Sequence, residues 1–356
     1  MLRQSNTHPL HWADKTMSVL RANQLEACEK ALACLPDCGL FDADVTDADA
    51  ETLFDLSFYA AEDRRPGAGV APVLHTIESL RARVLSALPA ELSLLSMDEH
   101  DLLLKTALTG GHFPLTDWND VLPARNLARR LWCRVEKEED RMSLILPRQL
   151  CVMVLLRLAA DDHRAIREKV EQVADSIDNT LYLTGIMQAS APRQHLAGLL
   201  KGTVAEDHPA LLDRFLHTSY DYIHDRGGHM LLIHPGLAEP EHLLRRLNQP
   251  GGETSAFLAM NNGDLNDANA CIEDLEDPLY ERMLFQLQDV VRPELTPEDA
   301  VEDLIILAKQ EVPFPDMEEV LSSMLICIPT PEMLRALKDL SDQIPRWLCL
   351  SSSRVQ

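Results

Sequence analysis

The sequence predicts a mainly α-helical protein, a multi-helix bundle or an array of antiparallel helices, with at most a small β-hairpin near residues 131–146. Two features of composition support this prediction. Aromatic residues make up 5% of the chain although 46% of it is apolar, so the core must depend on aliphatic residues and methionine, which favour helices. Six of the 14 glycines come as adjacent pairs, which are typical of breaks between helices. The third observation is a set of helix-start signals.

The clearest helix starts lie near the C-terminus. Thr296-Pro297-Glu298 and Thr330-Pro331-Glu332 each place an N-cap threonine before a proline and an acid, the residues preferred at the positive end of a helix. Asp316 is expected to cap another helix between them. The two Thr-Pro-Glu starts are 34 residues apart, which is the period of a helix–turn–helix repeat. Two interpretations fit this spacing: a short repeat, or two helix caps that share the same residues by coincidence.

Evidence for strands is limited to two short stretches. Residues 131–136 and 141–146 flank a polar stretch and show partial alternation, which predicts a hairpin; a continuous charged helix is the alternative. Residues 229–234 (HMLLIH), bounded by Gly228 and Pro235, form a second strand candidate.

Breaks in the pattern suggest how the chain is organised. Residues 64–72 (RRPGAGVAP) and 248–255 (NQPGGETS) are rich in proline and glycine, as expected of loops. The charge changes abruptly after the second loop. We therefore expect a mostly helical domain over residues 1–250, with a subdivision permitted near 64–72, and an acidic helical domain over 253–356.

The formal net charge of −24 is confined to two segments. Residues 37–63 contain nine acids and no base, and residues 253–319 contain eighteen acids and three bases, so these segments account for all of the net charge. Phosphate binding needs clustered Lys and Arg, and the charge therefore argues against direct nucleic-acid or anionic-membrane binding. It permits a basic protein partner. The alternative is that both segments are solvated helix faces that keep the protein soluble.

The N-terminus and the cysteines indicate a reducing compartment. The first fifteen residues lack the apolar region of a secretory leader, and no run approaches the roughly 18 apolar residues of a membrane span. The eight cysteines include no CxxC pair. We therefore expect a cytoplasmic protein with reduced cysteines and no membrane segment.

Histidines are concentrated in residues 195–242, which hold seven of the thirteen. A helix is predicted over residues 210–226, and within it His217, Asp221 and His224 are spaced i, i+4, i+7, which places three potential ligands on one face. Imidazole and carboxylate together suit a divalent transition metal. The buried stripe of this helix lies on the opposite side, so a polar exposed face is the alternative reading.

The adjacent pair His224-Asp225 resembles the His-Asp dyad of the helical metal-dependent phosphohydrolases of the HD type. In that family the dyad lies on a helix facing a cleft, with a further histidine upstream, a position that His195 could fill. The resemblance covers the two residues of this dyad, and together with the helical spacing it leads to the hypothesis of a metal-dependent hydrolase that uses His217, Asp221, His224 and Asp225. This is the second functional hypothesis, and an acidic mimic of nucleic acid that competes with DNA for a basic protein is the third.

The first hypothesis is a non-catalytic binding or adaptor protein without a cofactor. The short motifs GxxxxGK[ST], GxGxxG, GxSxG and HExxH are absent, which lowers the expectation of an enzyme without removing it. The segregated charge points to a protein partner docked on the acidic C-terminal helices. The residues predicted to bind it are Glu298, Asp299, Glu302, Asp303, Glu318 and Glu319.

Overall fold

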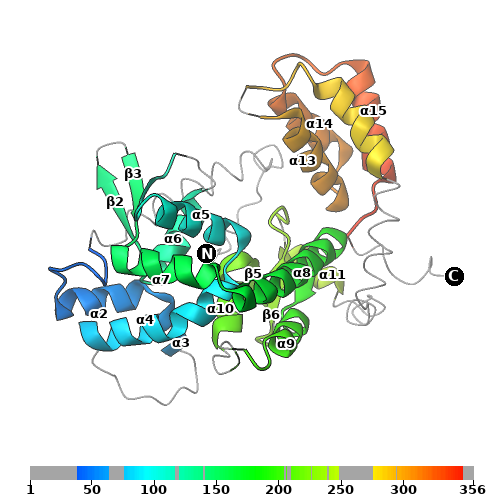
Figure 1. The fold of residues 1–356 in the computed structure, drawn as a ribbon. Coiled ribbons are helices and arrows are strands. Elements are labelled where there is room, and N and C mark those ends of the chain that lie inside the picture. The colour runs from blue at the N-terminus through cyan, green and yellow to red at the C-terminus, as the bar shows by residue number, and fades with distance from the viewer. Residues whose placement is uncertain are drawn as a thin grey trace. The chain divides into compact units, whose positions relative to one another are not determined.

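The computed structural model describes residues 38–63, 76–116, 120–138, 141–203, 206, 210–225, 227–238, 240–247, 276–293 and 295–347. Within these residues the protein is mainly helical, with two small three-stranded antiparallel sheets, which confirms the predicted fold class (Figure 1). No helix of the described part combines the length and the apolarity needed to cross a membrane.

The chain forms two compact units that alternate along the sequence. Among the described residues, 38–173 and 191–219 belong to one, here called the α5 unit, and 174–190 and 220–347 belong to the other, called the α13 unit. The predicted loops at 64–72 and 248–255 lie outside the described residues, so the domain boundaries expected there stay predictions.

The α5 unit is built mostly from helices around one apolar core. Ala124 and Leu127 from α6, together with Leu103 from α5, are completely buried in it. The helices of this unit are α2 (Asp47–Leu56), α3 (Phe58–Asp63), α4 (Ile77–Glu91), the 3-10 turn η2 (Leu92–Leu94), α5 (Met97–Leu108), α6 (Val121–Arg129), α7 (Arg148–Leu158), the first part of α8 (Asp161–Thr184), α9 (Ser190–Leu199) and α10 (Ala210–Ser219).

The predicted hairpin is present in the α5 unit. Strand β2 (Arg134–Glu138) pairs with β3 (Arg141–Ile145), and β1 (His112–Pro114) pairs with the other edge of β3, giving the order β1-β3-β2. Val135 lies opposite Leu144, and both are buried in the helical core. The alternation in the sequence reflects this buried face, and the alternative of a continuous charged helix is wrong.

The pair Gly110-Gly111 ends α5, as predicted for a glycine break. Gly110 has φ of 83° and donates to the carbonyl of Ala107, while Gly111 donates to the carbonyl of Thr106 at 2.9 Å. This is the Schellman arrangement, which favours glycine because it needs a left-handed residue. The carbonyl of Gly111 then accepts a hydrogen bond from Leu146 at 2.8 Å, which joins the helix end to the sheet.

The α13 unit contains a second sheet, so the expectation of at most one hairpin is too narrow. Its strands are β4 (Ile186–Gln188), β5 (Asp221–His224) and β6 (Met230–Ile233), in the order β4-β6-β5. The strand predicted at 229–234 is therefore confirmed. The helix predicted over 210–226 is wrong beyond Ser219, because the chain turns into β5 there. Asp225 stabilises the following turn by accepting hydrogen bonds from the backbone of Gly227 and His229 at 2.7 and 2.8 Å.

The C-terminal helices have a core of their own. Residues 276–287 are helical, and the named helices are α11 (Pro240–Leu247), α13 (Pro297–Lys309), α14 (Phe314–Met324) and α15 (Pro331–Gln343). Helices α13, α14 and α15 pack together in orange and red in Figure 1. Their shared core includes Leu304, Leu321 and Leu337, all fully buried.

Two of the three predicted caps at these helices are confirmed. The hydroxyl of Thr296 accepts a hydrogen bond from the backbone of Asp299 at 3.1 Å, and that of Thr330 accepts one from Met333 at 3.2 Å. The prediction for Asp316 is wrong, since α14 begins at Phe314 and Asp316 lies in its first turn. Pro313 occupies the N-cap position, so the helix starts three residues earlier than an Asp316 cap would start it.

The end of α13 offers a stabilising substitution. Glu311 occupies the left-handed position of a Schellman motif with φ of 60°, and Val312 donates to the carbonyl of Leu307 at 3.1 Å. A glycine relieves the crowding of a β-carbon in this conformation, so we expect Glu311→Gly to raise the free energy of unfolding by about 0.5–1 kcal/mol in urea titrations. Glu311→Ala keeps the β-carbon and should bring no such gain. Equal stability of the glycine variant and the wild type would contradict this explanation.

Candidate functional site

The structure does not form the helix face on which the predicted metal site depends. His217 lies near the end of α10 in the α5 unit, where its Nδ1 is 2.6 Å from the carbonyl of Asp213. Asp221 and His224 are the first and last residues of strand β5 in the α13 unit. In the part of the chain that is described, no group of three or more His, Cys, Asp or Glu side chains is placed to hold a metal ion.

The His224-Asp225 pair also differs from the helical dyad that it resembles. His224 ends β5 and is exposed, and Asp225 follows in the hairpin turn. Hydrogen bonds from the backbone and side chain of His229 lower the pKa of Asp225 and hold its carboxylate in the turn. Asp225 therefore has a structural role that explains its presence beside a glycine pair.

A serine and a histidine approach each other in the α5 unit. The hydroxyl of Ser93 in η2 is 3.1 Å from Nδ1 of His163 in α8, and both residues are buried. In a hydrolase, a third group orients the far ring nitrogen of the histidine. Here the Nε2 of His163 is buried without a hydrogen-bond partner in the described structure. The pair thus lacks the geometry of an activated nucleophile.

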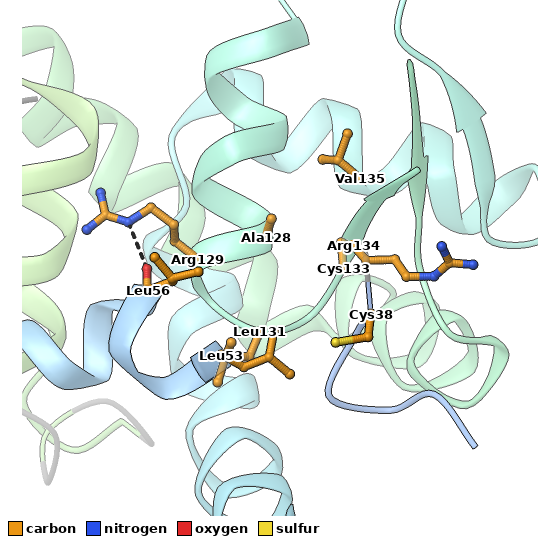
Figure 2. A pocket seen from close by; sticks show the side chains of 9 residues that line it. All are labelled: Cys38, Leu53, Leu56, Ala128, Arg129, Leu131, Cys133, Arg134 and Val135. Atoms are coloured by element: carbon orange, nitrogen blue, oxygen red, sulfur yellow. Dashed lines mark hydrogen bonds between the residues drawn. The ribbon is translucent and has the colours of Figure 1, made fainter. Parts of the chain in front are cut away.

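A small hollow lies between α2, the end of α6 and strand β2. It is lined in part by Cys38, Cys133 and Leu131, and Figure 2 shows Arg129 beside it donating to the carbonyl of Leu56 at 3.4 Å. Its cavity volume is ≈ 10 Å³, about the space of one water molecule. Sites for small-molecule ligands are larger by more than an order of magnitude, so this hollow does not hold a substrate.

A buried ionic cluster joins five elements of the α5 unit. Glu91 at the end of α4 accepts hydrogen bonds from Arg130, Arg214 and the hydroxyl of Tyr59. Arg130 also donates to Glu99 of α5 at 3.0 Å. Glu91, Arg130 and Arg214 are each at most 4% exposed. Because the guanidinium groups of Arg130 and Arg214 pair with these buried carboxylates, we assign the cluster to the stability of the fold.

A second buried charge pair lies in the α13 unit. Lys309 donates to Glu276 at 2.6 Å and lies 4.0 Å from the ring centre of Tyr182, whose hydroxyl also donates to Glu276. Trp347 donates from its indole to the carbonyl of Tyr182 at 2.9 Å. Burial lowers the pKa of Lys309, and the nearby carboxylate of Glu276 opposes this effect. The cluster connects α8 to the C-terminal helices and is enclosed by them.

Four carboxylates lie near the side chain of Tyr280. This side chain lies on the helix of residues 276–287, and its pKa is raised by burial and then by the nearby carboxylates of Glu302, Glu298, Glu281 and Asp299. Glu281, Glu298 and Glu302 are exposed. Three of the six residues predicted to bind a partner are therefore brought together on one surface. The helix 276–287 contributes Tyr280 and Glu281, which sequence reasoning missed.

The other predicted docking residues lie elsewhere. Asp303 is buried, with 2% of its surface exposed, and cannot contact a partner directly. Its position in α13, three residues after Ala300 and four before Leu307, places it on the buried side of the helix. Glu318 and Glu319 belong to α14, whereas the carboxylates that raise the pKa of Tyr280 lie on α13 and on the helix of residues 276–287.

An apolar side chain extends this surface. Phe285 lies one helical turn after Glu281, so both side chains share a face of the helix, and 72% of the phenylalanine is exposed. Aromatic residues are enriched at protein-binding surfaces relative to the rest of the surface. We call Tyr280, Glu281, Phe285, Glu298, Asp299 and Glu302 the acidic docking surface.

Comparison of the chain with protein-family models, with curated proteins and with solved structures finds no match.

Proposed function

We propose that this protein is a non-catalytic adaptor that binds a basic protein partner on the acidic docking surface. The observation that carries the proposal is the convergence of four carboxylates from two helices around Tyr280, whose pKa is raised by burial and then by these carboxylates. Repulsion between these carboxylates slightly destabilises the unbound protein, and a cationic partner would relieve this repulsion.

The surface favours a partner that combines positive charge with an apolar residue. Lys or Arg side chains would pair with Glu298 and Glu302, which are exposed on successive turns of α13. Phe285 offers an apolar contact one turn from Glu281. Aromatic residues contribute more binding energy than rim charges, whereas the charges increase the rate of association and make it sensitive to salt. A basic amphipathic segment would use both.

Binding assays on charge variants test the proposal. The tagged full chain captures partners from cell extract at low and high salt, and each captured protein is then titrated in purified form. For Glu281→Gln/Glu298→Gln/Glu302→Gln we expect the affinity to fall about tenfold at low salt, since each exposed ion pair contributes up to about 1 kcal/mol. For Phe285→Ser we expect a loss of similar size that is independent of salt.

A matched control separates this surface from net charge. Asp44→Asn/Glu51→Gln/Glu78→Gln removes the same number of charges from exposed positions of the α5 unit. The control should bind as the wild type does. Equal losses in both triple variants, or binding that neither the triple variant nor Phe285→Ser weakens, would show that the partner does not use the acidic docking surface.

A further inference from the structure

Two stacked imidazole rings fasten the start of α8 to the rest of the α5 unit. The rings of His163 in α8 and His100 in α5 are 6.0 Å apart, with an angle of 11° between their planes. Only 2% of His163 is exposed. Its Nδ1 contacts the hydroxyl of Ser93 in η2 at 3.1 Å. Three elements therefore meet at one neutral ring pair.

Arg167, one turn further along α8, reinforces the same junction. It donates to the carbonyl of Leu95 after η2, to the sulfur of Met97 and to Glu171 at 3.0 Å. This places a permanent positive charge close to both imidazoles. A proton added to either ring would meet repulsion from this guanidinium.

The carboxylates around the ring pair do little to stabilise a protonated imidazole. Asp162 is paired with Arg157 of α7, Glu171 is paired with Arg167, and Asp101 lies 3.5 Å from Nδ1 of His100. The titratable and charged groups that face the pair are Glu99 and Asp101 from α5, Arg157 from α7, and Asp162, Arg167 and Glu171 from α8.

We propose that the His100–His163 stack is an acid-sensitive latch, which holds the N-terminal part of α8 against α5 and η2 while both rings are neutral and releases it when they are protonated. The buried Nε2 of His163 has no hydrogen-bond partner in the described structure, so a proton there has nothing to bind until the helix moves away.

The direction of the pH effect follows from the two states of His163. Burial, followed by the charges of His100, Arg157 and Arg167, lowers the pKa of His163 to about 4, and burial followed by Arg167 lowers that of His100. A released ring would titrate near 6.5. The released state therefore binds more protons between pH 6.5 and 4, and the latch weakens as the pH falls through this window.

Hydrogen exchange on the full chain tests the latch. Opening constants of backbone amides in residues 93–104 and 161–170 are measured from pH 7 to pH 5 and corrected for the intrinsic exchange rate. For a shift of His163 from 6.5 to about 4, we expect these constants to rise about 20-fold over this range. Amides of helix α15, which lies in the α13 unit and contains no histidine, serve as the internal reference.

Three variants make the result specific. Ser93→Ala/His100→Phe/His163→Phe keeps stacked rings that cannot titrate and leaves no unpaired hydroxyl, so its opening constants should change less than threefold. His163→Asn preserves a partner for Ser93 and should also lose most of the pH response. The exposed His112→Gln should behave as the wild type does. A 20-fold rise that persists in the triple variant or in His163→Asn would overturn the proposal, as would a wild type without the rise.

Discussion

Replacing Glu91 with alanine is expected to lower the free energy of unfolding by about 3–5 kcal/mol. Glu91 accepts hydrogen bonds from the buried guanidinium groups of Arg130 and Arg214 and from the hydroxyl of Tyr59. Truncation removes the carboxylate that the two buried guanidinium groups share, so their positive charges lose part of their compensation, while Glu99 still pairs with Arg130. The cost arises mainly from this lost compensation rather than from the removed side chain.

Urea unfolding followed by far-ultraviolet circular dichroism measures this loss. Glu91→Gln keeps an acceptor but removes the negative charge, and it should lie between the wild type and the alanine variant. Glu78→Gln, an exposed change in the same helix, should shift stability by less than about 0.5 kcal/mol. A cost below 1 kcal/mol for Glu91→Ala would mean that the cluster does not support the α5 unit.

The second large effect is expected at Gly111. A β-carbon built there would lie 2.2 Å from the carbonyl oxygen of Leu146 and 3.1 Å from the sulfur of Cys151, at a φ of 96°. The oxygen belongs to the backbone that joins β3 to α7, so it cannot move without breaking the hydrogen bond to Gly111. We expect Gly111→Ala to cost about 3 kcal/mol or more.

Gly110 provides the matched comparison. It also has a left-handed backbone, with φ of 83°, but a β-carbon there would meet nothing within 4 Å. Gly110→Ala should therefore cost only the conformational strain, about 1 kcal/mol. Thermal and urea unfolding of the two variants separate the effects. Similar losses at both positions would show that the close approach to Leu146 is unimportant.

Local signals explain what the sequence could predict. The starts at Thr296 and Thr330 depend on the hydrogen bonds of one helical turn, and the end of α5 depends on one left-handed glycine. Such features are encoded within four or five residues. The hairpin of β2 and β3 was also predictable, because its strands are adjacent and one face is buried.

The second sheet shows why a local pattern can mislead. Residues 220–223 place two tyrosines and an isoleucine before the pair Gly227-Gly228, which is a strand-and-turn pattern as much as a helical one. What decides is the pairing of β5 with β6 and of β6 with β4, which lies more than 40 residues earlier. When β4 and β6 are left out of account, the i, i+4 spacing of His217 and Asp221 is consistent with a helix.

The candidate surface was predictable only in part. Glu298, Asp299 and Glu302 lie on the polar side of α13, and the apolar spacing around Asp303 could have excluded that residue. Tyr280 and Glu281 lie on the helix of residues 276–287, and the spacing of residues in the sequence does not reveal that this helix packs against α13. The same applies to Glu91, whose partners Arg130 and Arg214 are 39 and 123 residues away.

The alternation of the two units along the chain has a consequence for synthesis on the ribosome. The α5 unit needs residues 191–219, and Arg214 supplies a hydrogen bond to Glu91. During synthesis Glu91 therefore lacks its hydrogen bond from Arg214 until α10 has emerged from the ribosome. Strand β4 likewise lacks its partner strand until β6 has been synthesised. The order of translation thus makes each unit depend on segments that follow part of the other, and no single cut within residues 174–219 yields either unit complete.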